Sequence, residues 1–425
     1  MKQQTKYKDT AVGKIPEDWE VNTFDEIFIF LRTNSFSRDN LTYDEINNEI
    51  FNIHYGDIHA TFKEPILDFN KESNIPKVKD EFIEKIKISE DDYLRDGDLI
   101  IADASEDYEG LCDSVEIINI ENRKAVSGLH TFAVRANKDV IAKGFNAYIL
   151  RSQLLRKEFR RIATGISVFG VSKTNLSKLK LPIPPLPEQK AIANVLSTWD
   201  KAIEKHEQLI AQKELRKKGL MQRLLNEKFK EKNEKWEEVR LGEVISYENG
   251  KAHEQDIDEN GNFIVVNSKF ISTEGEVAKK TNAANCLAKK DDILMVLSDV
   301  PNGKAIAKCF YVETDNLYTV NQRICKLTAI KANSKFLFYI INRNPYFLAF
   351  DDGVKQTNLR KEEVLECSIQ LPKIEEQNRI AQILQTADKE IQLLKEKTEW
   401  LREQKKGLMQ VLLTGRKRLN YDLVD

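Results

Sequence analysis

The sequence predicts an α+β fold in which two α/β globular domains alternate with two long helices. The helices are expected to form an antiparallel coiled coil, and a pseudo-twofold internal repeat relates the two halves. Three observations predict this plan: a segment in mid-chain that recurs near the C-terminus, an apolar seam at heptad spacing within it, and short apolar runs with turns before it. A chain of 425 residues is also too long for one ordinary core.

The repeat aligns residues 181–225 with residues 369–413 without a gap. From Glu188 to Leu225, 17 of 38 positions are identical to the second copy, whereas chance gives about two or three. The block KKGLMQ at 217–222 recurs intact at 405–410. The repeat predicts these boundaries: first globular domain 1–185, first helix 186–228, second globular domain 229–373, second helix 374–415, and C-terminal tail 416–425.

Each copy of the repeat is predicted to be a long helix. Pro187 suits a first helical turn, and Glu188 suits the positive end of the helix dipole. An apolar seam at heptad positions cannot be buried by one helix alone, so the other copy is the simplest partner, over about 60 Å. The residues expected to pair the helices are Leu196, Trp199, Ile203, Ile210, Leu220, Leu224, Leu384, Ile391, Leu394, Leu401, Leu408 and Leu412.

Two glycines interrupt the helical pattern, Gly219 and Gly407. Glycine inside a helix costs about 1 kcal/mol relative to alanine. Close approach of another backbone and an early helix end explain them equally well.

The globular parts mix apolar runs with turns, which is typical of short strands in α+β domains. Runs 98–102, 131–134, 263–266 and 293–297 are predicted strands. Helices are predicted at Asn146–Arg161 and Ser334–Ile341.

Polar residues cluster beside the predicted strand ends. Arg, Lys, Asn and Gln are the side chains that hydrogen-bond to base edges, although Asn, Asp and Ser also populate ordinary turns. Asn321-Gln322-Arg323 is the most suggestive group, because all three can contact purines. The candidate DNA-binding residues are His54, Tyr55, Ser105, His130, Arg160, Arg161, Ser172, Lys173, Asn267, Ser268, Lys269, Asn302, Lys304, Asn321, Gln322, Arg323, Lys355 and Gln356.

Charge is unevenly distributed. The net charge is −2, but residues 1–100 hold 13 basic and 22 acidic residues, whereas residues 151–180 hold eight basic residues against Glu158. A DNA-facing patch requires such segregation, since phosphate neutralisation drives binding. A solvated helix face is the alternative.

Motifs for chemistry are missing from the sequence. The five cysteines are scattered and form no Cys-x-x-Cys pair, so buried thiols are expected and no metal or catalytic site. Asn344-Pro345-Tyr346 is one proline short of an adenine-methyltransferase motif and is better explained as a turn at a helix end. No signal peptide, membrane span or Walker A motif is found, so a cytoplasmic binding protein is expected.

The segment LPIPPLPEQ, Leu181 to Gln189, followed by a helix ending in KKGLMQ, resembles type I restriction-modification specificity subunits. The resemblance covers nearly the whole chain, although Lys373 stands where the first copy has Pro185. It implies two target recognition domains, each reading half of a bipartite double-stranded DNA site, with the coil setting the gap between the halves.

The same resemblance implies partners and excludes an active site in this chain. Methyltransferase subunits, expected as two copies, would dock on the scaffold and supply S-adenosylmethionine chemistry. Restriction and translocase subunits would supply ATP- and Mg-dependent cleavage, and this chain would hold no cofactor. Because the two globular parts differ, the site should be asymmetric. A coiled-coil interaction protein unrelated to DNA and a divergent methyltransferase remain as alternatives.

Overall fold

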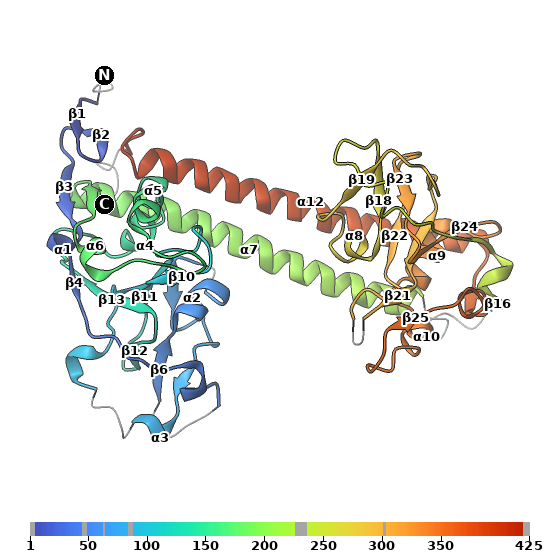
Figure 1. Cartoon of the computed structure of the whole chain (residues 1–425), viewed down its shortest axis with the longest axis horizontal. Coiled ribbons are helices and arrows are strands. Elements are labelled where there is room, and N and C mark those ends of the chain that lie inside the picture. Colours follow the sequence, from blue (N-terminus) through green and yellow to red (C-terminus); the bar gives the residue numbers. More distant parts are fainter. Residues whose placement is uncertain are drawn as a thin grey trace. The chain divides into compact units, whose positions relative to one another are not determined.

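The structure is a computed structural model that describes residues 5–44, 49–62, 64–83, 88–225, 236–300 and 303–419. It divides into two units, and each unit combines one globular domain with parts of both long helices. Unit 1 comprises residues 1–207 and 396–425, and unit 2 comprises residues 208–395. The α+β fold class is confirmed, with two globular domains and two long helices, α7 (Leu186–Leu224) and α12 (Ile374–Leu412) (Figure 1).

Unit 1 is built on a five-stranded sheet in the order β4-β13-β9-β11-β7. These strands are β4 (Phe28–Phe30), β7 (Ile66–Asp68), β9 (Leu99–Ala102), β11 (Ser114–Ile118) and β13 (Thr131–Ala136). The central strand β9 is fully buried, as its continuous apolar run predicts. All pairings in this sheet are antiparallel except that of β11 with β7.

A second sheet of unit 1, in the order β12-β6-β8-β5, lies beside the first. Its strands are β5 (Leu41–Thr42), β6 (Ile50–Ile53), β8 (Lys77–Val78) and β12 (Lys124–Ser127). Two-stranded pairs join β1 (Tyr7–Thr10) to β2 (Gly13–Pro16), β3 (Glu20–Thr23) to β15 (Lys180–Ile183), and β10 (Ala104–Ser105) to β14 (Phe169–Gly170). The short helices are α1 (Phe24–Ile27), α2 (Tyr55–Ala60), α3 (Asp80–Ile83), α4 (Asn146–Ile149), α5 (Gln153–Ile162) and α6 (Lys173–Ser177).

Unit 2 repeats this topology in a smaller form. Its main sheet has the order β17-β24-β20-β22, with β17 (Ile245–Asn249), β20 (Ile293–Val296), β22 (Cys309–Tyr311) and β24 (Ile324–Ala329). The second sheet joins β18 (Phe263–Val266), β19 (Lys279–Thr281) and β23 (Tyr318–Val320). Strand pairs join β16 (Glu237–Arg240) to β26 (Ser368–Leu371) and β21 (Ser298–Asp299) to β25 (Thr357–Asn358). The short helices are α8 (Ser268–Ser272), α9 (Ser334–Ile341), α10 (Pro345–Leu348) and α11 (Lys361–Leu365).

Most element predictions agree with the structure, and one does not. The four apolar runs form β9, β13, β18 and β20, and the predicted helix Ser334–Ile341 is α9. The single helix predicted at Asn146–Arg161 is wrong, because α4 and α5 are separate helices there. The hydroxyl of Ser152 accepts a hydrogen bond from the backbone N–H of Leu155 and starts α5 anew.

Each long helix is fixed at its start by the glutamine of the repeated Glu-Gln pair. The side chain of Gln189 donates to the carbonyl of Pro184 at 2.8 Å and accepts from the N–H of Ala142 at 2.7 Å. Gln377 donates to the carbonyl of Pro372 at 2.7 Å and accepts from the N–H of Asn333 at 2.8 Å. A buried amide that satisfies both of its groups holds the helix against its domain at a fixed position.

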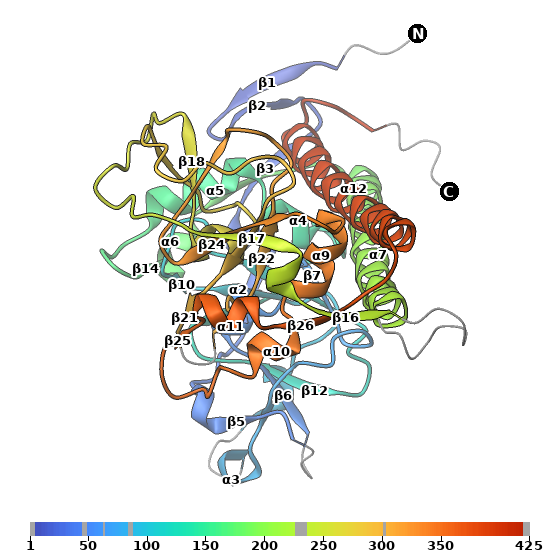
Figure 2. The ribbon, with the colours of Figure 1, turned by 90° about the vertical axis from the view of Figure 1, so that its right-hand side faces the viewer.

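The two long helices pack against each other, and ion pairs mark their opposite directions. In unit 1, Asp200 and Glu207 of α7 pair with Lys405 and Arg402 of α12. In unit 2, Lys213 and Lys217 of α7 pair with Glu390 and Asp388. In both units a higher residue number in α7 meets a lower one in α12, which is antiparallel pairing, and two views show the helices side by side (Figures 1 and 2).

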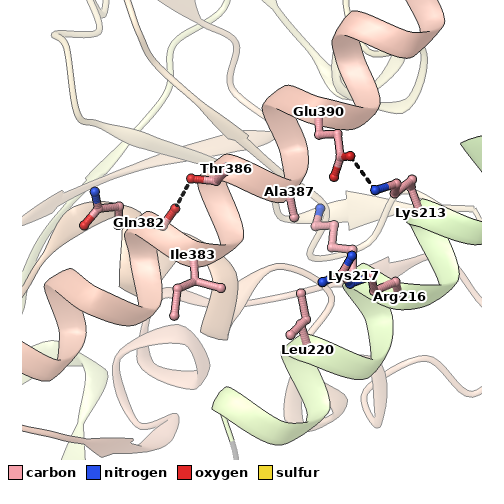
Figure 3. A pocket seen from close by; sticks show the side chains of 9 residues that line it. All are labelled: Lys213, Arg216, Lys217, Leu220, Gln382, Ile383, Thr386, Ala387 and Glu390. Carbon is pink, nitrogen blue, oxygen red and sulfur yellow. Dashed lines mark hydrogen bonds and ion pairs between the residues drawn. The ribbon is translucent and has the colours of Figure 1, made fainter.

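The seam between the helices is less apolar than the heptad pattern suggests. The twelve residues expected to pair the helices are all buried or half-buried. In unit 2, however, a hollow of about 400 Å³ separates the helices, and Leu220 and Ala387 line it together with Lys213 and Lys217 (Figure 3). Polar seam residues reach carboxylates of the opposite helix, so ion pairs supplement the apolar contacts there.

The end of each helix packs into the globular domain of the other half of the repeat. In unit 1, Leu412 of α12 and the adjacent Leu413 join a core cluster that contains Ile192 and Leu196. In unit 2, Leu220 and Leu224 of α7 pack against the corresponding cluster around Ile380 and Leu384. This reciprocal packing accounts for the leucines and the methionine that the two copies share within and after the repeated segment KKGLMQ.

The explanations offered for Gly219 and Gly407 are both wrong. A Cβ added at either glycine would meet nothing within 4 Å, so no backbone approaches closely. Both helices also continue past the glycine, to Leu224 and Leu412. Nothing in the structure explains these two glycines.

All five cysteines are buried and free, as expected. Burial raises the pKa of Cys112 and Cys325 to about 12, so these thiols stay protonated. In the part of the chain that the structure describes, no helix combines the length and apolar character needed to cross a bilayer.

Candidate nucleic-acid interface

Three backbone hydrogen bonds bring four segments of unit 1 together where its strands end. The N–H of Gly128 donates to Ile53 at 2.9 Å and joins the turn after β12 to the end of β6. The N–H of Asp103 donates to His130 at 3.1 Å, and the N–H of Val171 donates to Asp103 at 2.9 Å. The start of α2, the 128–130 turn, the end of β9 and the segment before α6 therefore share one edge.

Unit 2 contains the same three hydrogen bonds. The N–H of Asn321 donates to Val266 at 3.0 Å, that of Leu297 to Arg323 at 3.0 Å, and that of Leu359 to Leu297 at 2.8 Å. We call the backbone segments joined by these three hydrogen bonds the frame of each unit. The two frames can therefore be matched residue by residue. In this match, His54 corresponds to Asn267, Tyr55 to Ser268, Gly56 to Lys269, Gly128 to Asn321, Leu129 to Gln322, and His130 to Arg323.

Aromatic rings dominate the edge of unit 1. The ring centroid of Tyr55 lies 4.7 Å from that of His54, 5.4 Å from that of His130 and 6.1 Å from that of His59. His130 has a positive φ of 55° and its Nδ1 lies 3.3 Å from a carboxylate oxygen of Asp103. The structure thus gathers three predicted residues, His54, Tyr55 and His130, into one cluster.

The histidines of this cluster have different protonation tendencies. Burial and the nearby Arg38 lower the pKa of His54, whose Nδ1 accepts the N–H of Gly56 at 3.1 Å. A neutral ring that accepts at Nδ1 carries its proton on Nε2, which is a hydrogen-bond donor. The hydrogen bond with Asp113 instead raises the pKa of His59. Near neutral pH, the cluster can offer a neutral ring and a more readily charged one.

Amide and basic side chains dominate the edge of unit 2. They line a hollow of about 440 Å³ made by Glu254, Asn267, Ser268, Lys269, Asn321, Gln322 and Arg323. Both amide groups of Asn321 and Gln322 donate to one carboxylate oxygen of Glu254, at 3.2 and 3.3 Å. The hydrogen bond from Asn321 lowers the pKa of Glu254, so it remains a carboxylate that orients the two amides.

Residues at the start of α8 complete this hollow. The side chain of Asn267 accepts from the N–H of Phe270 at 2.9 Å and caps the helix. The buried Ser268 Oγ has no hydrogen-bond partner among the described residues. Lys269, Gln322 and Arg323 are exposed. These three exposed side chains carry hydrogen-bond donors and surround a hollow lined by amides. Such donors can bind base edges and phosphates.

The other predicted residues lie near these edges in different ways. Ser105 is buried on β10, Ser172 caps α6, and the ammonium group of Lys173 lies 4.6 Å from the ring centroid of Phe30. In unit 2, Gln356 donates to the hydroxyl of Ser298 at 2.6 Å, and Lys304 and Lys355 are exposed. Asn302 lies outside the described residues.

The basic helix α5 makes many contacts within unit 1. Arg156 bonds to the carbonyls of Glu109 and Leu111 and pairs with Asp113. The predicted Arg160 pairs with Glu109, and the predicted Arg161 pairs with Glu158 at 2.6 Å. Much of the positive charge in this segment is therefore already neutralised by carboxylates.

Sequence reasoning missed several residues of these edges. Glu254 lies 67 positions from Asn321, and nothing local in the sequence connects them. His59 and Arg38, whose guanidinium pairs with Asp57 at 2.8 Å, were also missed. The signal for His59 was its place one helical turn after Tyr55.

The Asn344-Pro345-Tyr346 segment is a helix cap. The side chain of Asn344 accepts the N–H of Tyr346 at 2.9 Å, and Pro345 occupies the first turn of α10. The structure therefore uses this segment to begin a helix after the turn that follows α9.

Known proteins share this plan. The family model described as type I restriction modification DNA specificity domain matches residues 16–214 and 233–403. A Methanocaldococcus jannaschii protein assigned as the specificity subunit of type I restriction enzyme MjaX is 26% identical, over 97% of this chain and 97% of its own.

Solved structures show the same fold. A chain from a study of complex assembly and conformational transition in the type I system is 17% identical, with a TM-score of 0.58 over 95% of this chain and 99% of its own. The type I specificity subunit from M. genitalium is 17% identical, with a TM-score of 0.54 over 93% of this chain and 96% of its own.

Proposed function

This chain belongs to the family of DNA specificity subunits of type I restriction-modification systems, and we propose that its two domains each read one half of a bipartite, asymmetric DNA site. Within the family this subunit is the non-catalytic component that gives the complex its DNA specificity. The recognition domains in this proposal are residues 1–185 and 229–373.

The matched backbone frames with different side chains carry the proposal. Each unit closes the same edge with three equivalent hydrogen bonds, yet His130 stands where the other unit has Arg323, and Tyr55 where it has Ser268. Arginine reads guanine and asparagine reads adenine in the major groove, whereas His and Tyr offer single hydrogen bonds and ring faces. Two equivalent frames with unlike side chains favour two unlike half-sites.

The DNA-contacting residues in this proposal are those that reach the two edges. In unit 2, Asn321, Gln322 and Arg323 would contact base edges, and Lys269, Lys304 and Lys355 would contact phosphates. In unit 1, His54, Tyr55 and His130 would contact bases, and Lys173 would contact phosphate. Arg160 and Arg161 would contribute to the field of the surface more than to direct contacts, because each pairs with a carboxylate.

The helix pair would act as a spacer in the assembled complex. Deleting one heptad from each helix removes about 10 Å of helix, which corresponds to about three base pairs of duplex. Methylome mapping of this variant should show both half-sites unchanged and the gap shortened. Altered half-site letters with an unchanged gap would exclude the spacer role.

Membership in a type I complex supports a proposal for the partners and the compartment. We propose that two methyltransferase subunits dock on the helices and bring S-adenosylmethionine, and that restriction subunits bring ATP and Mg-dependent cleavage. The complex would work in the cytoplasm, where its DNA is. Unlike side chains at equivalent positions of the two edges favour two unlike half-sites irrespective of these partners and of the compartment.

The decisive experiment changes one edge at a time in the assembled methyltransferase. Arg323→Ala should relax methylation at positions of one half-site only, by about 1–3 kcal/mol of discrimination per lost bidentate contact. His130→Ala should relax the other half-site only, and Lys331→Ala, an exposed control on unit 2, should change neither. Relaxation of both halves by one substitution would refute the division of labour.

A further inference from the structure

One exposed aliphatic side chain occupies the same place in each unit. Among the described residues, Ile166 is 93% exposed and Val354 is 76% exposed, the highest values for large apolar side chains in their units. The gap-free alignment that places residues 181–225 on residues 369–413, extended towards the N-terminus, also places Ile166 on Val354. Single exposed apolar residues are common, but the same position in two domains that otherwise differ is not expected by chance.

Both side chains are held outward by a structured loop. Ile166 follows Gly165, which has a φ of +122°, and Val354 follows Gly353, which has a φ of +70°. A Cβ at Gly165 would lie 1.9 Å from the carbonyl oxygen of Val168, so only glycine fits this turn. Paired hydrogen bonds between Thr164 and Gly170, of 2.8 and 2.9 Å, close the loop around Ile166.

Two carboxylates accept hydrogen bonds from the backbone of the loop in unit 2. The side chain of Asp352 accepts the N–H groups of Val354 and Lys355, at 2.9 and 3.1 Å. Asp351 accepts the N–H of Gly353 at 3.0 Å. Ordering the backbone that carries an exposed apolar side chain before binding lowers the entropy cost of a later contact.

Both loops adjoin the edges proposed to contact DNA. The loop around Ile166 leads into β14, which pairs with β10, and then to Val171, which bonds to Asp103. The loop around Val354 leads into β25, which pairs with β21, and then to Leu359, which bonds to Leu297. Each aliphatic side chain thus precedes the residue that completes its edge by five positions.

We propose that Ile166 and Val354 each make an apolar contact with the C5-methyl group of a thymine, one in each half-site. This inference rests on the proposed function. The thymine methyl is the apolar feature of the major groove. A β-branched side chain presents methyl groups with little torsional freedom, which suits contact with one methyl group. Apolar wedges between base steps are a feature of proteins that bind the minor groove, whereas the thymine methyl lies in the major groove.

A protein partner is less well supported by the same surface. A stable protein interface buries about 800 Å² on each side, and the neighbours of these side chains, Ser167 and Lys355, are polar and exposed. Val168, which is 55% exposed, is the other exposed aliphatic side chain of the unit 1 loop. Even with it, the apolar tip is far smaller than such an interface and suits one apolar group within a polar groove.

The test uses the methyltransferase complex assembled on this chain and duplexes that carry the mapped site. Deoxyuridine, which lacks the C5-methyl, replaces each thymine in turn. The unaltered complex should lose about 3- to 10-fold in affinity at one thymine in each half-site. Ile166→Ala should weaken binding to the same degree on thymine DNA and should be insensitive to deoxyuridine in one half-site. Val354→Ala should behave likewise in the other half-site.

Matched controls are available in both units. Ile29→Ala in unit 1 and Ile330→Ala in unit 2 remove exposed aliphatic side chains of 68% and 62% exposure that are outside the two loops. Both should leave affinity and deoxyuridine sensitivity unchanged.

Three results would overturn the inference. The first is that Ile166→Ala or Val354→Ala lowers affinity equally on thymine DNA and on deoxyuridine DNA. The second is an increase in 2-aminopurine fluorescence, which reports unstacking by a wedge. The third is that either variant impairs assembly of the complex while the complex that does assemble binds DNA with unchanged affinity. None of these results would contradict the proposed function. That function is tested by whether Arg323→Ala and His130→Ala each relax the specificity of methylation in one half-site only.

Discussion

The two units differ where they present side chains to solvent and agree where they hold the long helices. Tyr148 donates to Asp200 at 2.7 Å in unit 1, and Tyr339 donates to Asp388 at 2.6 Å in unit 2. The two aspartates are equivalent positions of the helical repeat, as are their partners Lys405 and Lys217. Contacts that position the domains are thus duplicated, whereas the side chains at the two strand-end edges are not.

This difference separates two kinds of constraint. A side chain that docks a helix must match a partner elsewhere in the same chain, so its substitution costs folding free energy. Under the proposed function, a side chain on the edge has its partner in DNA, so its substitution should change specificity at little cost in stability. The following experiments test how far the duplicated contacts are energetically equivalent.

The largest effect is expected from the duplicated leucines at the helix starts. Leu196 and Leu384 are both fully buried, each in a cluster with the end of the other helix. Leu196→Ala and Leu384→Ala should each lower the unfolding free energy of their unit by about 2–5 kcal/mol. Urea unfolding followed by hydrogen exchange in each unit measures this, and losses that differ by more than about 2 kcal/mol would break the equivalence.

A pH dependence should distinguish the units. Burial raises the pKa of Glu116 to about 7, whereas the matching position of β22 is Tyr311. A carboxyl whose folded pKa is raised contributes stability below its usual pKa of about 4.5, and this stability is lost as pH rises through about 7.

Glu116→Gln should remove that dependence. Relative to the variant, the unaltered protein should lose about 3 kcal/mol of unit 1 stability as pH rises from about 5 to about 8. Thermal unfolding across this range measures the difference, with Tyr311→Phe as the unit 2 control that keeps the slope. An unchanged slope in Glu116→Gln would contradict the assigned pKa.

A smaller loss is expected at the duplicated tyrosines. Tyr148→Phe and Tyr339→Phe each remove a hydrogen bond to a charged acceptor, which is worth about 1.5–3 kcal/mol. A double-mutant cycle with Lys405→Met or Lys217→Met should show coupling, because each lysine pairs with the same aspartate. Additive losses would mean that the tyrosine and lysine do not share that carboxylate in solution.

The smallest effect should have the opposite sign. Gly219 and Gly407 lie inside the helices with open space at the Cβ position. Gly219→Ala and Gly407→Ala should each raise the unfolding free energy by about 0.5–1 kcal/mol. Destabilisation in either variant would contradict the open space around that Cβ position.

Sequence patterns could predict the regular elements because those patterns have local causes. The apolar run of β9 and the start of α7 at Leu186 followed from burial and from proline at a helix start. The division between α4 and α5 was missed, although Ser152 is a good capping residue, because the flanking apolar residues continue a helical period.

The candidate edges could be predicted only in part. His54, Tyr55 and His130 follow strand ends, and the polar residues at such ends could be recognised one by one. Their convergence depends on the pairing of β6 with β12 and on a bond between Asp103 and Val171, which are distant in the sequence. The role of Glu254 in orienting two amides depends on chain folding of the same kind.

The reciprocal packing of the helix ends has an evolutionary consequence. Leu220 and Leu224 pack against a core cluster of unit 2, as Leu408 and Leu412 pack in the equivalent core cluster of unit 1. A genetic crossover within the stretch that encodes these leucines would therefore bring in a foreign globular domain together with leucines that fit the existing core cluster. Under the proposed function, new specificities could arise by exchange of whole domains, without compensating substitutions in the core clusters that receive the helix ends.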